Sequence, residues 1–246
     1  MLRPTALHVS CTRRYAKFRN MLQELITKTN TEDFYSDGNL HPISIKGHIG
    51  GFNTVELEFV IEEDGLDEKE DGYYPWKKVE YWKVIAHKAI QFNNLFAPIY
   101  LPYVKLRLLD DHPLLWEFKT DELECELTGE PENYHEFVGV LYHTFEENAG
   151  NWITFDKRLF NMAGSKPAEW KKALTIPEPM RQPIMNVCKD FGIEFRVNEV
   201  ISGDNKGYTN RPDLKLLMFG NEDVSSYDFN LGQPYIIAEN FIANKK

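Results

Sequence analysis

The sequence has few cysteines and no long apolar segment. Only three cysteines occur in 246 residues, Cys11, Cys125 and Cys188, and no two of them form a CxxC pair. An odd number allows at most one disulfide and leaves a thiol over, which favours a reducing compartment. No stretch approaches about 18 consecutive apolar residues, and the first residues lack the apolar run and cleavage site of a secretory signal. We therefore expect a cytoplasmic protein with no membrane partner.

The motifs of several enzyme and cofactor classes are also missing. The sequence contains no GxSxG, no HExxH and no GxxxxGK[ST]. Cys11 lies beside Arg13 and Arg14, but the segment has neither the arginine spacing nor the glycine of a phosphatase loop. The acidic run Glu62–Asp71 lacks the third and twelfth ligands of an EF-hand. These absences favour a protein that needs no cofactor and holds no metal.

Charge is plentiful but unevenly distributed. The net charge is −10, which disfavours nucleic acid and anionic membranes as partners. The first thirty residues hold six Lys or Arg and one acid, whereas Thr54–Gly72 holds nine acids and one lysine. Opposed patches of this kind favour a protein partner or self-association, although acidic loops also serve only to keep a protein in solution.

Helices are predicted where apolar residues recur at three- and four-residue spacing. The clearest follows Pro131, carries Tyr134, Phe137 and Leu141 on one side, and ends at Gly150. The same criteria predict the helices Thr12–Thr29, Pro75–Phe96, Gly164–Leu174 and Ile184–Phe191. The many β-branched residues of Pro75–Phe96 leave a strand as the alternative there.

Strands are predicted where apolar and polar residues alternate, most clearly at Thr54–Glu62. Three further strands, separated by short polar turns, are expected to form a meander: Tyr103–Leu109, Leu114–Lys119 and Leu123–Leu127. The closing strands are expected at Ile193–Ile201, Leu214–Phe219 and Tyr235–Ile237, and loops at Thr29–Pro42 and Ser202–Asp213.

Together these elements predict an α+β fold, a largely antiparallel sheet with helices packed against it in a single mixed globule. We expect one domain over residues 1–246. The Gly- and Pro-rich stretch Gly164–Pro183 is the candidate position for a subdivision.

The pool from which a catalytic site could be assembled consists of Asp110, Asp111, His112 and His143. Asp110, Asp111 and His112 are consecutive, and adjacent carboxylates with an imidazole can divide acid and base roles. Followed by Pro113, the same run is typical of a tight turn. His143 and Glu147 share one side of a helix and could seat a cation, or simply form its solvated face.

The polar loop Ser202–Asp213 carries the candidate binding residues Tyr208, Asn210 and Arg211. Aromatic and arginine side chains on loops are common binding anchors, and they also occur on inert loops.

Two hypotheses follow. The first is a non-enzymatic, acidic interaction or regulatory protein, because no complete catalytic set is visible. The second is a hydrolase or transferase with a site assembled from the dispersed Asp and His residues. Convergence of Asp110, Asp111, His112 and His143 in one pocket would favour the second.

Overall fold

The computed structural model describes residues 21–32, 34, 38–48, 53–64, 76–93, 95, 101–102, 105–153, 171–202, 213–219 and 234–246. Contacts divide the chain into two compact units. Unit 1 comprises Met1–Asp110, Lys215–Val224 and Leu231–Lys246, and unit 2 comprises Asp111–Leu214 and Ser225–Asn230. The candidate boundary Gly164–Pro183 lies inside unit 2, and the single-domain hypothesis stays a prediction.

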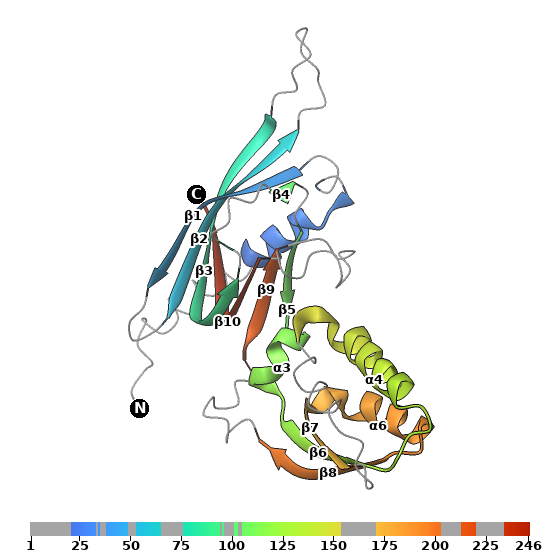
Figure 1. Ribbon diagram of the computed structural model, residues 1–246. Coiled ribbons are helices and arrows are strands. Elements are labelled where there is room, and N and C mark those ends of the chain that lie inside the picture. Colours follow the sequence, from blue (N-terminus) through green and yellow to red (C-terminus); the bar gives the residue numbers. More distant parts are fainter. Residues whose placement is uncertain are drawn as a thin grey trace, which may run out of the picture. The chain divides into compact units, whose positions relative to one another are not determined.

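Unit 1 is built on a seven-stranded sheet with the order β4-β1-β2-β3-β10-β9-β5 (Figure 1). Every strand pair in it is antiparallel. The strands are β1 (Gly38–His48), β2 (Thr54–Asp64), β3 (Trp76–Asn93), β4 (Leu101–Pro102), β5 (Leu106–Leu109), β9 (Lys215–Phe219) and β10 (Tyr235–Lys245). The α+β prediction with largely antiparallel sheets is confirmed.

The helix predicted at Pro75–Phe96 is wrong, because this segment is the long strand β3. It pairs with β2 on one side over residues 76–87 and with β10 on the other over residues 82–93, so residues 82–87 are paired on both sides. Trp82, Val84 and Ala86 alternate into the core, directly opposite apolar residues of β2. The alternation typical of a strand was present in the sequence, but polar residues also recurred at helical spacing. Only long-range pairing decides between a strand and a helix here.

One face of this sheet is covered by a helix. Residues 21–29 are helical, as predicted, while residues 12–20 of the predicted helix lie outside the described part of the chain. Leu22 and Leu25 are buried against the sheet, with Met21 and Ile26 packed beside them. Figure 1 shows this segment in blue, alongside β9 and β5. The stripe of apolar residues thus fixes which side of the helix meets the sheet.

The loop predicted at Thr29–Pro42 is wrong in its second half. Gly38–Pro42 belongs to β1, which pairs with β2 in a register that shifts between Pro42 and Ser44. Proline cannot donate to a ladder and is tolerated at such a bulge, so the Gly- and Pro-containing sequence misled the turn prediction. The strand Thr54–Glu62 is confirmed as β2.

Unit 2 is a three-stranded antiparallel sheet, order β7-β6-β8, with helices on one face. Its elements are α3 (Pro113–Lys119), β6 (Glu122–Thr128), α4 (Tyr134–Ala149), η1 (Gly150–Trp152), β7 (Lys171–Pro177), η2 (Glu178–Met180), α6 (Arg181–Asp190) and β8 (Glu194–Ile201). Phe137, Leu141 and Phe145 of α4 are buried with Ile184 and Val187 of α6 in one core.

Helix α4 confirms the clearest sequence prediction. Asn133 caps its start by accepting the backbone N–H of Glu136, and its own side chain donates to the Glu136 carboxylate. Gly150 ends it with a φ of 56°, a value that favours glycine. The helix at Ile184–Phe191, its stop at Gly192, and the strands at Ile193–Ile201 and Leu214–Phe219 are confirmed as well.

Four other predictions fail in whole or in part. Leu114–Lys119 is the helix α3 rather than a strand, because Pro113 occupies its first turn. The meander is absent from the described residues, since β5 pairs with β9 whereas β6 pairs with β7 and β8. Lys171–Leu174, the end of a predicted helix, lies in strand β7. Finally, β10 runs on to Lys245, well past the predicted Tyr235–Ile237.

Among the described residues, no helix combines the length and apolar character needed to cross a membrane.

Candidate functional site

The residues proposed from sequence as a reactive pool have local structural roles. Asp110, in unit 1, is 71% exposed and forms an ion pair with Lys215 at 2.9 Å. Asp111 and His112 belong to unit 2. Asp111 accepts the indole N–H of Trp116 at 3.3 Å. These contacts are those of a turn that leads into a helix, the interpretation that the following proline favoured.

His112 is the N-cap of α3. Its Nδ1 accepts the backbone N–H of Leu114 at 3.2 Å, and its ring packs edge-on against Trp152 with centroids 5.1 Å apart. The hydrogen bond that Nδ1 accepts is the capping bond at the start of α3. This bond and the contact with Trp152 orient the ring. Capping explains the histidine without a catalytic role.

His143 and Glu147 face solvent on α4. Their side chains are 64% and 61% exposed, and His143 Nε2 lies 3.0 Å from Glu147 Oε1. The pair is one turn apart, as the spacing predicted. No group of three or more His, Cys, Asp or Glu side chains is placed to hold a metal ion anywhere in the described ranges.

The two described cysteines are poor nucleophiles. Cys125 and Cys188 are free thiols buried in the unit 2 core. Burial raises the pKa of Cys125 to about 11, and burial with the neighbouring Cys125 raises the pKa of Cys188 to about 12. A thiol reacts as the thiolate, so both are inert near neutral pH.

Several sequence candidates lie outside the described residues. These are the binding residues Tyr208, Asn210 and Arg211, and Cys11 with its basic neighbours. Their assignments stay predictions.

The structure instead places a groove in unit 1, between the helix at 21–29 and the edge strand β5. Its volume is about 530 Å³. The lining residues are Gln23, Ile26, Thr27, Asn30, Thr31 and Leu106–Leu109. The helical members recur at three- and four-residue spacing and therefore form one side of the helix. No sequence motif signals this groove, because its two walls are some 75 residues apart, as the Asn30–Leu106 contact shows with a separation of 76.

The edge of β5 is only partly capped by that helix. Thr29 Oγ1 accepts the Leu106 N–H at 3.2 Å, and Asn30 Nδ2 donates to the Leu106 carbonyl at 2.8 Å. The direction of backbone hydrogen bonding alternates along a strand, so Leu108 directs its N–H and C=O to the same side as Leu106, away from β9. The groove therefore offers one backbone pair of a sheet edge beside leucine and isoleucine side chains.

The chemistry of the groove lining suits binding. Amide and hydroxyl groups of Gln23, Thr27 and Thr31 border the apolar side chains of Ile26 and Leu108. This is the usual composition of a recognition site, with apolar contacts for affinity and a few polar groups for orientation. Among the described residues, the lining holds no carboxylate, imidazole or thiol, the groups that serve most often in acid–base and nucleophilic catalysis.

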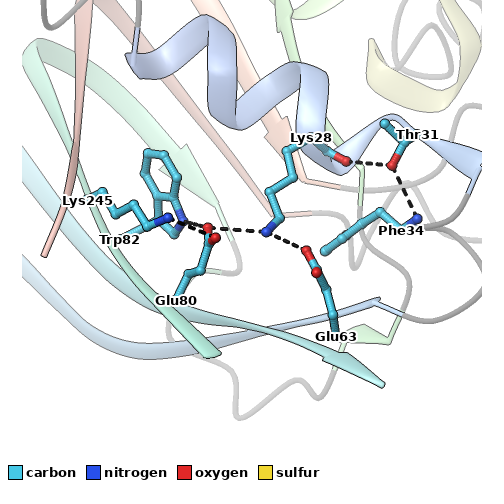
Figure 2. Close-up of polar contacts among 7 residues, drawn as sticks. All are labelled: Lys28, Thr31, Phe34, Glu63, Glu80, Trp82 and Lys245. Carbon is cyan, nitrogen blue, oxygen red and sulfur yellow. Dashed lines mark hydrogen bonds and ion pairs between the residues drawn. The ribbon is translucent and has the colours of Figure 1, made fainter. Parts of the chain in front are cut away.

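The helical wall of the groove is anchored to the sheet by an ion network centred on one buried carboxylate (Figure 2). Glu80 is only 5% exposed and lies among the core-facing residues of β3. Its carboxylate accepts the indole N–H of Trp82 at 3.0 Å and meets the ammonium groups of Lys28 at 3.2 Å and Lys245 at 2.8 Å. Figure 2 shows Lys28 pointing between Glu80 and Glu63, with which it also pairs.

This network joins the helix to β2, β3 and β10 with two carboxylates and two ammonium groups. Because the charges balance and three donor groups meet the Glu80 carboxylate, the network has a structural role. Thr31 stabilises the end of the helix, because its hydroxyl donates to the Lys28 carbonyl and accepts the N–H of Phe34. The groove wall is thereby preorganised. Glu80 lies in the segment predicted as a helix, and its alternation with Trp82 and Val84 was the sequence signal for an inward-facing position.

The opposite face of the large sheet bears an exposed apolar patch on β3. Val79 and Tyr81 are 45% and 51% exposed, whereas Val60 of β2, which lies directly opposite Tyr81, is 8% exposed. Ion pairs flank the patch, including Lys246 with Glu58 at 2.8 Å, whose hydrogen bond lowers the pKa of Glu58.

Comparison with known proteins gives no relative, since no protein-family model, no curated protein and no solved structure matches this chain.

Proposed function

We propose that this is a non-enzymatic interaction protein, adaptor or regulator, that binds a segment of a partner protein in the groove between residues 21–31 and β5. The proposal rests on one observation. The backbone of Leu108, at the edge of β5, lies in a groove that is lined by apolar and amide side chains and whose other wall is a helix anchored to the sheet. An extended peptide supplies both the backbone groups and the side chains that such a groove accepts, by strand addition at the sheet edge.

The acidic net charge and the uneven charge distribution support an electrostatically guided encounter with a partner. A cytoplasmic location is part of the proposal. It is supported by the free thiols Cys125 and Cys188, which persist most readily in a reducing compartment.

The test compares two substitutions on the same helix. Thr27 lines the groove, whereas Glu24 is equally exposed on that helix but does not line it. The tagged full chain is purified from its native host at low salt as wild type, Thr27→Tyr and Glu24→Tyr. A tyrosine at position 27 fills part of the groove, so we expect recovery of the specific partner to fall about ten-fold, with Glu24→Tyr unchanged.

Two results would contradict the proposal. One is a wild-type protein recovered with no stoichiometric partner. The other is a partner that Thr27→Tyr retains as well as wild type does, with circular dichroism showing both variants folded.

A further inference from the structure

The sheet edges of the described chain differ in how well they are protected. β4 has two residues, one of them Pro102, and the exposed side of β5 is capped at Leu106 by the helix. β7 begins with Lys171 and ends with Pro177. Short length, lysine and proline oppose pairing with another chain, and the cap leaves β5 only the Leu108 position proposed above for a peptide segment. Edge strand β8 has eight residues and neither proline, glycine nor lysine.

Edge strand β8 is also exposed along its length. Glu194 and Arg196 are exposed and project from the face opposite the unit 2 core, whereas Phe195 is half-buried beside that core. Charges on an edge strand normally prevent pairing, because identical copies place like charges together. The outcome here depends on the register in which two copies meet.

We propose that two copies of this chain associate by antiparallel pairing of their β8 strands, centred on Phe195. A two-fold axis perpendicular to the sheet requires one residue to lie opposite itself, and opposed residues then share a face. With Phe195 at the centre, Glu194 of each copy lies opposite Arg196 of the other. Two ion pairs form on one face and an aromatic pair on the other, and both kinds of cross-strand pair are stabilising.

The local geometry fits this register. The irregularity in the pairing of β8 with β6 comes after Val197, so residues 194–197 form a regular segment. Arg196 lies opposite Glu126 of β6 within its own copy. A guanidinium has five donors and can face a carboxylate on both sides. The two three-stranded sheets would join into one of six strands. The overlap is short, so the dimer is weak and depends on concentration.

This inference goes beyond the proposed function, because its occupant is a second copy and its surface is a different sheet edge in the other unit. The groove residues Thr27 and Leu108 are untouched by the test, so failure of either proposal can be recognised separately.

The test is sedimentation velocity of the full chain from micromolar to millimolar concentration at low salt. Glu194→Arg and Arg196→Glu each create two like-charge contacts, and each weakens self-association by about ten-fold or more. An equimolar mixture of these two variants restores opposite charges across the axis and recovers the dimer. The double variant Glu194→Arg/Arg196→Glu recovers it too. Glu199→Arg, exposed on the same strand but outside the register, leaves it unchanged.

A wild type that is monomeric at every concentration overturns the inference. So does an association that both single variants leave intact, or a mixture of the two that stays monomeric while circular dichroism shows each variant folded.

Discussion

Removal of the Glu80 carboxylate tests the physical account of unit 1 most directly. In Glu80→Ala, the indole N–H of Trp82 and the ammonium groups of Lys28 and Lys245 lose a shared acceptor. The three donors differ in what they can do next, and that difference sets the magnitude.

Lys245 is 42% exposed, so water replaces the carboxylate at little cost. Lys28 keeps its pair with Glu63. The Trp82 side chain is 1% exposed, and an unsatisfied buried donor costs about 1–3 kcal/mol. Loss of the Lys28–Glu80 ion pair adds a further ~1 kcal/mol. The free energy of unfolding of Glu80→Ala is therefore expected to fall by about 2–4 kcal/mol, near the lower end for breaking a buried ion pair. Glu80→Gln keeps an acceptor for the indole and is expected to lose about half as much.

Urea unfolding followed by tryptophan fluorescence measures the free energy, and hydrogen exchange of β3 and β10 amides reports unit 1 alone. Glu124→Ala, at an exposed position of β6, is the control and should change stability by about 0.5 kcal/mol or less. If Glu80→Ala matched wild type within about 0.5 kcal/mol, the network would not hold the helix to the sheet, and our reasoning on preorganisation would be refuted.

Two further predictions concern unit 2. Gly192 has a φ of 67° with open space around an added Cβ, so Gly192→Ala should cost about 1–2 kcal/mol of stability through the backbone alone. Gly139→Ala, inside α4, should instead stabilise the protein by about 0.5–1 kcal/mol. Equal effects of the two substitutions in urea unfolding would contradict this. Site-resolved iodoacetamide labelling should leave Cys125 and Cys188 unmodified in the native protein at pH 8 and modify both in urea. Rapid labelling of the native protein would show that the thiols are accessible. Because folding raises both pKa values above the ordinary 9.0, the unfolded state binds fewer protons than the native state in this range. The free energy of unfolding should therefore fall as pH rises from about 9 to about 12.

The predictability of each element depended on where its decisive interactions lie. Helix α4 was readable because its cap, its apolar stripe and its terminal glycine are all local. Strand β3 was not, because its partners β2 and β10 lie far away in sequence and its polar residues also suit a helix. The short helix α3 was missed since seven residues give little periodicity, and its cap is a histidine rather than a preferred capping residue.

The candidate site shows the same limit. The turn interpretation of Asp110–His112 succeeded because it rests on neighbouring residues. The groove could not be predicted, since the helix at 21–29 and the edge of β5 meet only through tertiary packing. The burial of Glu80 could not be predicted, because a charged residue is seldom buried unless paired, and its partners Lys28 and Lys245 come from remote segments.

The central position of β10 has a consequence for biosynthesis. Lys88 and Glu239, which pair across β3 and β10, are separated by 151 residues. While the chain emerges from the ribosome, the edge of β3 that pairs with β10 stays unpaired until residues 235–245 have been synthesised. Closing the long loop between the two strands is slow. Nascent chains halted within unit 2 should therefore be the species that chaperones hold and that aggregate first.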